Sequence, residues 1–370
     1  MAVRLEETTS IIIRAYAAKT NLLMLGKPGI GKTHTIEAFA ARMRERIEHF
    51  KVWHFYGPTM SPMDIQAAMP DVATGTLKMY SNACLPNAYT DPDAQGVIFI
   101  GEMLNTDPTT LKLLQKYVNG EDMNGVLKKP VGVMTIADSN RLEDKAGVMQ
   151  QFRALLNRFM TIDVYTEAED NIKYAARHDW HHLVQAFFRE NPHLIDNYED
   201  VFGTTVTNAK KDTEAAKKGD QTEEGKRGTW ACMRGWERVS ELEYAAADVG
   251  SAVTLDEIAG SVGKAPALKY NTFKAMVDRL ATIEEVLANP KKVAIPEKID
   301  ELYALCTIVA LKCKSEHLEA VYTFAKRIQD DMQAFMLRKL MQRKNFELVG
   351  TAIYREWITT PAINDLVNGR

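Results

Sequence analysis

Several features that mark membrane, secreted or nucleic-acid-binding proteins are missing from this sequence. No apolar run approaches the roughly 18 residues that a membrane-spanning helix needs. The N-terminus carries Arg4, Glu6 and Glu7 and lacks the apolar core of a signal peptide. The formal net charge is -3, so no basic excess indicates an obligate nucleic-acid binder. The sequence predicts a cytoplasmic protein with no membrane partner, and it disfavours a nucleic-acid partner without excluding one.

Groups of metal-ligating residues are also scarce. His178 and His182 would share a helix face at a zinc-capable spacing, but no third ligand accompanies them, so a plain helix surface is the favoured interpretation. The four cysteines are scattered and predict free thiols in a reducing compartment; they are Cys84, Cys232, Cys306 and Cys313.

What the sequence does contain is a phosphate-binding pattern, G-x-x-x-x-G-K-[ST], at residues 26–33. An apolar run at 21–25 precedes it and predicts a strand, and apolar residues at helical spacing after it predict a helix. A phosphate-binding loop requires this order of strand, glycine loop and helix. Such a loop points backbone N–H groups and a helix N-terminus at phosphate oxygens. Lys32 would reach the terminal phosphates of ATP, and the Thr33 hydroxyl would hold Mg²⁺. The expected nucleotide-binding residues here are Gly26, Pro28, Gly29, Ile30, Gly31, Lys32, Thr33 and His34.

Apolar strands alternating with helices predict an α/β core with a parallel, helix-covered sheet. A helix is marked by Asp107 as N-cap, Pro108 in the first turn and Asn119-Gly120 at its end. Residues 1–20 predict an amphipathic helix that either walls the nucleotide base or simply packs. Residues 57–95 lack periodicity and predict a loop so long that it is functional or hides an element. The expected strands are 21–25, 51–55, 96–100, 131–137 and 159–165.

Three parts are predicted along the chain. An α/β core spans 1–165, a helical lid spans 166–288, and a helical C-terminal region spans 289–370 and opens with a Pro-containing break at 289–296. Within the lid, residues 208–229 mix basic and acidic side chains without large apolar ones, which predicts a solvated, mobile loop.

Acidic and amide side chains follow two of the expected strands. The usual strand-end pattern is an acid that supports Mg²⁺ followed by a glutamate that polarises the attacking water. Here Gly101 stands in the first position, and Glu102 is assigned the catalytic, water-activating role and a water-mediated contact to Mg²⁺. Asn140 follows the next strand and could orient the same water, because ligands bind at the carboxyl ends of parallel strands.

Two arginines, Arg153 and Arg158, lie just before the last expected strand. An exposed arginine there could stabilise the transition state on a neighbouring subunit's nucleotide. A surface salt bridge is the competing interpretation for either one.

Five segments resemble, in order, those of MoxR-type AAA+ ATPases over roughly residues 10–270; they are GKPGIGKT, VIFIGEMLNTDPTTLKLLQKYVNG, TIADSNR, FRALLNRFMTIDVY and MRGWERVSEL. The resemblance implies that residues 26–33 are the Walker A loop and Gly101-Glu102 the Walker B end. It further implies that Asn140 is sensor 1, Arg158 the arginine finger (with Arg153 the other choice) and Arg234 a nucleotide-contacting sensor 2.

The resemblance also implies a P-loop NTPase AAA+ core with a five-stranded parallel sheet between helices, followed by a helical lid and tail. Such proteins form hexameric rings. They act as ATP-driven, chaperone-like remodellers, often alongside a partner with a von Willebrand factor A domain.

Gly101 departs from the family pattern and leaves the function open. The glycine is compatible with a slow ATPase, with a subunit that only binds ATP, or with another carboxylate taking over, for which Asp138 is a candidate. Three functions therefore remain: an ATPase that remodels a protein partner, an ATP-binding assembly module with weak hydrolysis, and a nucleic-acid-linked motor.

Overall fold

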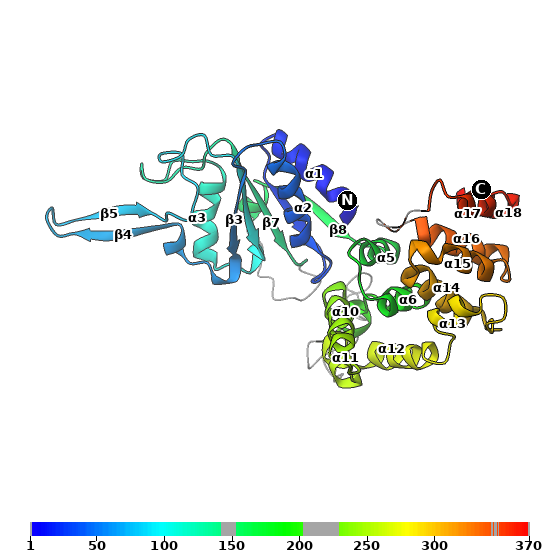
Figure 1. The fold of residues 1–370 in the computed structure, drawn as a ribbon. Helices are drawn as coiled ribbons and strands as arrows, with labels where there is room; N and C mark the ends of the chain where they lie inside the picture. The colour runs from blue at the N-terminus through cyan, green and yellow to red at the C-terminus, as the bar shows by residue number, and fades with distance from the viewer. Residues whose placement is uncertain are drawn as a thin grey trace. The chain divides into compact units, whose positions relative to one another are not determined.

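The computed structural model describes residues 2–141, 153–202, 229–341, 343, 346 and 348–368. The chain divides into two compact units, and the division falls between Glu167 and Ala168 in the sequence (Figure 1). The loop predicted at 208–229 lies outside the described residues except for Thr229.

The first unit is built on a parallel six-stranded sheet with the order β1-β8-β2-β7-β6-β3. The five predicted strands are all present, although Val131 is 81% exposed and its strand begins only at Val133. The sixth, β1, is a three-residue edge strand that carries no detectable periodicity. The strands are β1 (Ala2–Arg4), β2 (Leu22–Leu25), β3 (Lys51–Tyr56), β6 (Gly96–Gly101), β7 (Val133–Ser139) and β8 (Met160–Tyr165).

Helices cover both faces of this sheet, which is why its central strands are apolar throughout. Successive side chains of β6 point to opposite faces. Val97 and Phe99 pack in the cluster that contains α1 (Leu5–Ala17) and α2 (Lys32–Arg44). Ile98 and Ile100 pack in the cluster that contains α3 (Pro108–Val118) and α4 (Arg153–Leu156).

The predicted ends of α3 are confirmed. The Asp107 carboxylate accepts hydrogen bonds from the backbone N–H groups of Thr109 and Thr110, both at 2.9 Å, which satisfies donors that the first helical turn leaves open. Asn119 caps the other end, and Gly120 follows with a φ of 71°. The predicted N-terminal helix is α1, and it packs on the sheet through Ile12 and Tyr16.

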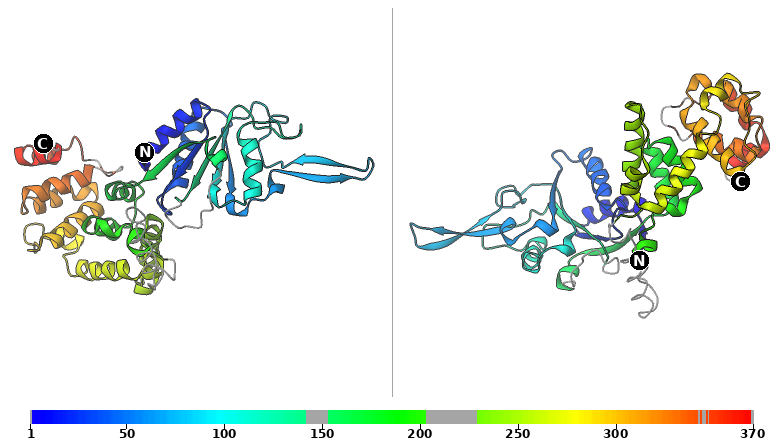
Figure 2. Two further views of the ribbon diagram at one scale, coloured as in Figure 1. Left: turned by 180° about the vertical axis from the view of Figure 1, so that it is seen from behind. Right: turned by 90° about the horizontal axis from the view of Figure 1, so that it is seen from below.

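The stretch 57–95 contains a β-hairpin that the sequence did not reveal. Strands β4 (Gln66–Asp71) and β5 (Thr76–Ser81) pair antiparallel, and Figure 2 shows them extending away from the sheet of the same unit. Pro70 within β4 argues against a strand in a sequence pattern, yet a two-stranded ribbon consists only of edges, where proline is tolerated. Several large apolar side chains of the hairpin are exposed, among them Val72, Leu77 and Tyr80.

The second unit is helical, as predicted for the chain beyond residue 166. One hydrophobic cluster surrounds Phe187, Trp236 and Tyr270, and another surrounds Phe324 and Trp357. Among the described helices, none is both long and apolar enough to cross a membrane. The helices are α5 (Ala168–Arg177), α6 (His182–Glu190), α7 (Tyr198–Phe202), α10 (Met233–Asp248), α11 (Leu255–Val262), α12 (Lys264–Val277), α13 (Ile283–Ala288), α14 (Ile299–Lys312), α15 (Leu318–Ala325), α16 (Asp330–Met341), α17 (Ala352–Ile358) and α18 (Pro361–Asn368).

The histidine cluster is arranged differently from the prediction. His178 follows the end of α5 and His182 begins α6, so they do not share one helix face. His178 stacks on Tyr174 at a ring distance of 4.1 Å, whereas His181 is buried between the two helices' ends. Over the described residues, no group of three or more histidine, cysteine or acidic side chains is placed to hold a metal ion. All four cysteines are free thiols, as predicted.

Burial of His181 makes the stability of the protein dependent on pH. Burial, reinforced by the positive charges of Lys312 and Lys274, lowers the pKa of His181 to about 4. Between an unfolded pKa of about 6.5 and that value, the unfolded chain binds a proton that the folded chain does not, so stability falls as the pH falls. One such proton contributes about 1.4 kcal/mol per pH unit to the free energy of unfolding.

We therefore expect His181→Phe to flatten the loss of stability between pH 6.5 and about 4 by about 1.4 kcal/mol per pH unit. Denaturant unfolding at several pH values would measure this. Tyr244→Phe is the control, because it keeps the ring packed on His181 at 4.9 Å and removes only the hydroxyl that donates to the Asp179 carbonyl oxygen. Equal slopes in His181→Phe and wild type would contradict the assignment.

Candidate nucleotide-binding site

The strand order brings the predicted site residues of the first unit to one edge of the sheet. The strands β2, β7 and β6 are direct neighbours and run parallel, so their carboxyl ends meet. Residues 26–33 follow β2, Glu102 follows β6 and Asn140 follows β7. Leu25 pairs with Ser139 and Ile100 with Ala137, which aligns the three strand ends in register. This edge is where ligands bind in open α/β sheets.

The glycine loop has the backbone that its pattern requires. Gly31, the N-cap of α2, has a φ of 99°, and Gly29 has a φ of 80°; both are values that residues with a Cβ rarely adopt. A Cβ on Gly26 would lie 2.6 Å from the carbonyl oxygen of Val164. The loop thus turns tightly against β8 and directs the N-terminus of α2 inward, with Thr33 and His34 exposed in its first turn.

Lys32 links the loop to Asn140. Its ammonium group donates hydrogen bonds to the carbonyl oxygens of Gly26 at 2.6 Å and Lys27 at 2.9 Å, and to Oδ1 of Asn140 at 3.4 Å. Only 6% of Lys32 and 7% of Asn140 are exposed. Because an ammonium group has three N–H donors, this arrangement uses all of them. The predicted sensor residue and the lysine predicted to bind phosphate therefore belong to one polar group.

Glu102 is held in an unusual backbone conformation at the end of β6. Its φ of 51° and ψ of 42° lie in the left-handed region, which is uncommon for a residue other than glycine and clusters at functional sites. Its backbone N–H donates to Oδ1 of Asp138 at 2.9 Å. Its carboxylate accepts a hydrogen bond at 3.1 Å from the side-chain amide of Asn105, a residue that the sequence reasoning missed. The signal was the spacing of three residues, which a 3-10 turn over Met103–Asn105 brings back onto Glu102.

Gly101 is not required by packing. A Cβ at this position would lie 3.6 Å from Cδ2 of Tyr56 and 3.8 Å from Oδ1 of Asp138, which are ordinary contacts. No positive φ is found at Gly101 either. The position therefore has room for an acidic side chain, and crowding does not explain why a glycine stands there.

The oxygen donors of this edge suit magnesium. Mg²⁺ takes oxygen ligands, keeps several waters and is usually held by one or two carboxylates together with substrate phosphates. The edge offers the Thr33 hydroxyl and the carboxylates of Glu102 and Asp138. This donor set fits Mg²⁺ accompanying a nucleotide.

Arg158 lies away from its own chain's loop. It stands two residues before Met160, which pairs with Leu22 at the start of β2, so it is at the opposite edge of the sheet. Six residues of extended strand span about 20 Å. The Arg158 side chain is half-buried, whereas the sequence reasoning expected an exposed arginine. The side chain of Arg153 lies outside the described residues.

Arg234 belongs to the second unit and is exposed in the first turn of α10. The next two residues hold α10 in place. A Cβ on Gly235 would lie 2.4 Å from the carbonyl oxygen of Ser261, and Trp236, fully buried, donates from Nε1 to the carbonyl oxygen of Leu194 at 3.0 Å. The packing explains the glycine and the tryptophan, and the sensor 2 role of Arg234 stays a prediction.

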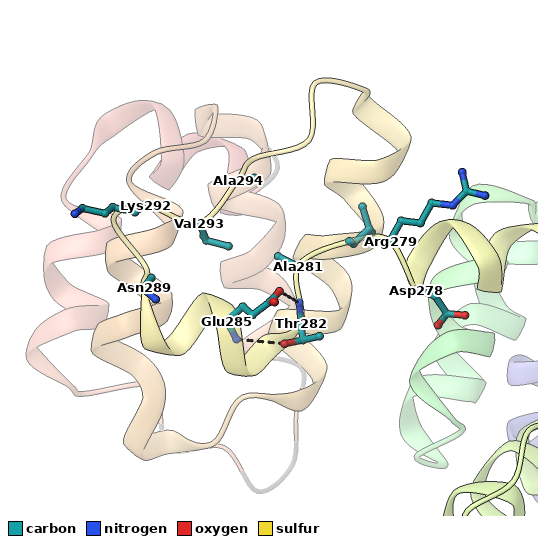
Figure 3. A pocket seen from close by; sticks show the side chains of 10 residues that line it. Asp278, Arg279, Ala281, Thr282, Glu285, Asn289, Lys292, Val293 and Ala294 are labelled. Carbon is teal, nitrogen blue, oxygen red and sulfur yellow. Dashed lines mark hydrogen bonds between the residues drawn. The ribbon is translucent and has the colours of Figure 1, made fainter.

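The second unit also has an open surface pocket of about 740 Å³ where α12 leads into α13 (Figure 3). The side chains of Thr282 and Glu285 form a capping box there, which hydrogen-bonds the backbone N–H groups of these two residues. Arg279 and Lys292 also line the pocket, but no glycine loop does. The pocket therefore lacks the phosphate loop that residues 26–33 supply in the first unit.

No family model matches this chain, and no curated protein matches it. Several solved structures do. A protein from Cytophaga hutchinsonii whose assignment as an ATPase is provisional is 17% identical with a TM-score of 0.33; the match covers 47% of this chain and 51% of that one, about half its length. A variant of RuvB from Thermotoga maritima is 16% identical with a TM-score of 0.36, over 77% and 76% of the two chains. Hsp104 bound to ATPγS and casein is 14% identical with a TM-score of 0.34, over 47% and 35%.

Scores this low do not establish a shared architecture by themselves. The assignment of the first unit to the P-loop α/β class depends on the observed strand order and on the loop that follows β2.

We expect Gly26→Ala to lower the free energy of unfolding by about 1–3 kcal/mol, because the added methyl group meets the Val164 carbonyl. Denaturant unfolding would measure the loss. Gly260→Ala is the matched control, since its Cβ meets open space within α11 and should be neutral or slightly stabilising. An unchanged stability for Gly26→Ala would show that the loop does not pack on β8 as described.

Proposed function

We propose that this protein is a MoxR-like AAA+ ATPase that binds Mg-ATP between subunits of a ring and couples hydrolysis to the remodelling or assembly of a protein partner. The observation that carries the proposal is the shared polar group of Lys32 and Asn140 at the glycine loop, one strand away from Glu102. The ordered motifs that resemble the MoxR type support the narrower assignment.

Nucleotide binding follows from the loop. Phosphate oxygens accept hydrogen bonds from the backbone N–H groups of residues 26–33 and from the N-terminus of α2. When nucleotide binds, Lys32 exchanges the carbonyl oxygens of Gly26 and Lys27 for oxygens of the terminal phosphates. A charged phosphate oxygen attracts the ammonium group more strongly than a neutral carbonyl oxygen does. Thr33 and the strand-end carboxylates hold Mg²⁺, which supplies charge neutralisation on the phosphates when bound.

Hydrolysis needs a water aligned with the terminal phosphate. Glu102 accepts the proton of that water, and Asn105 fixes the direction of the carboxylate through its 3.1 Å hydrogen bond. Asn140 contacts Lys32 and therefore senses whether the lysine points to its own loop or to a phosphate. This is a positioning role, distinct from proton transfer.

A ring arrangement accounts for Arg158. Because its backbone lies at the far edge of the sheet, it is about one strand length from its own loop, and a neighbouring subunit is the partner that it could serve. A ring of identical heterologous interfaces, such as a hexamer, supplies that neighbour for every subunit.

The projecting hairpin would contact a protein client. A protein with a von Willebrand factor A domain is one choice for this client. Val72 is 93% exposed and Leu77 is 69% exposed, so β4 and β5 present apolar surface to water. Exposed apolar patches of this kind mark sites of protein contact. The hairpin would transmit the movement of the ATPase core to the client.

A second candidate function is an ATP-binding assembly module with weak hydrolysis, because Gly101 supplies no carboxylate at the position before Glu102. Gly101→Asp distinguishes the two functions because the position has room for the side chain. A large gain in turnover would favour the assembly module, whereas an unchanged rate would favour the ATPase.

We expect Lys32→Ala to weaken ATP binding by about 10-fold or more, because it removes charge-assisted hydrogen bonds to phosphate. Glu102→Gln should instead keep ATP binding and lower turnover by about 100-fold or more, because it removes the proton acceptor. Nucleotide titration and phosphate release, on protein at concentrations that allow assembly, separate the two effects. Lys112→Ala, on the exposed side of α3, is the control. A wild-type protein that binds ATP without any turnover would overturn the ATPase.

We expect turnover to reappear when the inactive variants Glu102→Gln and Arg158→Ala are mixed and allowed to exchange subunits. The Arg158→Ala subunit still has Glu102, and the Glu102→Gln subunit still has Arg158. An interface that takes Glu102 from the first and Arg158 from the second is complete, and random mixing makes about a quarter of the sites complete. Phosphate release before and after mixing measures this. Mixtures that stay inactive despite proven subunit exchange would show that Arg158 does not act on a neighbouring subunit.

A further inference from the structure

We infer that Asp138 supplies, from the strand between β2 and β6, the metal-side carboxylate that Gly101 lacks. The inference rests on the proposed function, since it concerns the Mg²⁺ that accompanies the nucleotide. The sequence offers Asp138 as a candidate substitute because it lies near Asn140, and the structure adds its strand, its hydrogen bond to Glu102 and its distance from position 101.

The first observation is proximity to the vacant side-chain position. Oδ1 of Asp138 lies 3.8 Å from the point where a Cβ of residue 101 would be. A carboxylate starting from Gly101 and the carboxylate of Asp138 would therefore occupy the same corner of the site. The corner already holds one acid, from the neighbouring strand.

The second observation is the position of β7 in the sheet. This strand lies directly beside β2, so Asp138 pairs with Met24, two residues before the loop begins at Gly26. Position 101 is one strand farther from the loop. Asp138 also stands two residues before Asn140, which follows β7 and whose side chain contacts Lys32. The carboxylate thus belongs to the phosphate side of the edge.

The third observation is what the carboxylate does now. Asp138 is 6% exposed, and its Oδ1 accepts the backbone N–H of Glu102 at 2.9 Å. A carboxylate has two oxygens with about four lone-pair sites, so it can accept this N–H and a metal-bound water together. One side chain would then fix the backbone of the water-activating Glu102 and hold the metal's hydration shell.

Asp138→Asn is the informative variant because the amide oxygen can still accept the Glu102 N–H while the charge is lost. The probe is a fluorescent, non-hydrolysable ATP analogue, titrated in Mg²⁺ and in EDTA, with Mn²⁺ binding by electron paramagnetic resonance as a second readout. Asp163→Asn is the matched control: Asp163 pairs with Leu25 from β8, on the other side of β2, and its removal takes one carboxylate from the same sheet.

We expect Asp138→Asn to bind the analogue with wild-type affinity in EDTA. The increase in affinity on adding Mg²⁺ should be about 10-fold smaller than in wild type, and Mn²⁺ should bind correspondingly more weakly. Adding Gly101→Asp to Asp138→Asn should restore that gain, because the new side chain reaches the same corner. Asp163→Asn should behave as wild type.

Two results overturn the inference while leaving nucleotide binding in place. One is an unchanged Mg²⁺ gain in Asp138→Asn. The other is a loss of binding in EDTA as large as in Mg²⁺, which would make the carboxylate purely structural. If the wild-type chain binds no analogue in either condition, the proposed function itself fails, and the two failures are thereby distinguishable.

Discussion

The hydrogen bond between Lys32 and Asn140 joins residues 108 positions apart, and the rest of the site depends on the arrangement that permits it. It requires β7 to lie directly beside β2, because Asn140 follows β7 and Lys32 belongs to the loop that follows β2. The same order places β6 next to β7 and brings Glu102 to within hydrogen-bond distance of Asp138. The proximity of the glycine loop, Asn140 and the strand-end acids is thus a consequence of one strand order.

Charge at this edge is distributed unusually. Gly101 contributes no acid, yet the buried carboxylate of Asp138 fixes the backbone of Glu102, and Asn105 fixes its side chain. Oδ1 of Asp138 lies 3.8 Å from the point where a Cβ of residue 101 would be, so the acid next to Glu102 comes from the neighbouring strand.

Much of the first unit could be predicted because its central strands are buried on both faces and therefore read as apolar runs, as Gly96–Gly101 does. The helix after Asp107 was equally predictable, since its cap is local in sequence. The β4–β5 hairpin was missed because its side chains are exposed and Pro70 argues against a strand. His178 and His182 were placed on one face because helical spacing was assumed across a turn at which Asp179 takes a φ of 51°.

The sequence alone determined the phosphate loop, since glycine spacing, a lysine and a hydroxyl within eight residues are local and their chemistry needs no distant partner. It also determined the alternation of strands and helices. Only the tertiary structure decided that Asp138 accepts the Glu102 N–H, that Asn105 bonds Glu102, and that Arg158 lies at the far edge of the sheet. These relations depend on strand order and register, which fix contacts between residues far apart in the chain and leave no periodic signal in it.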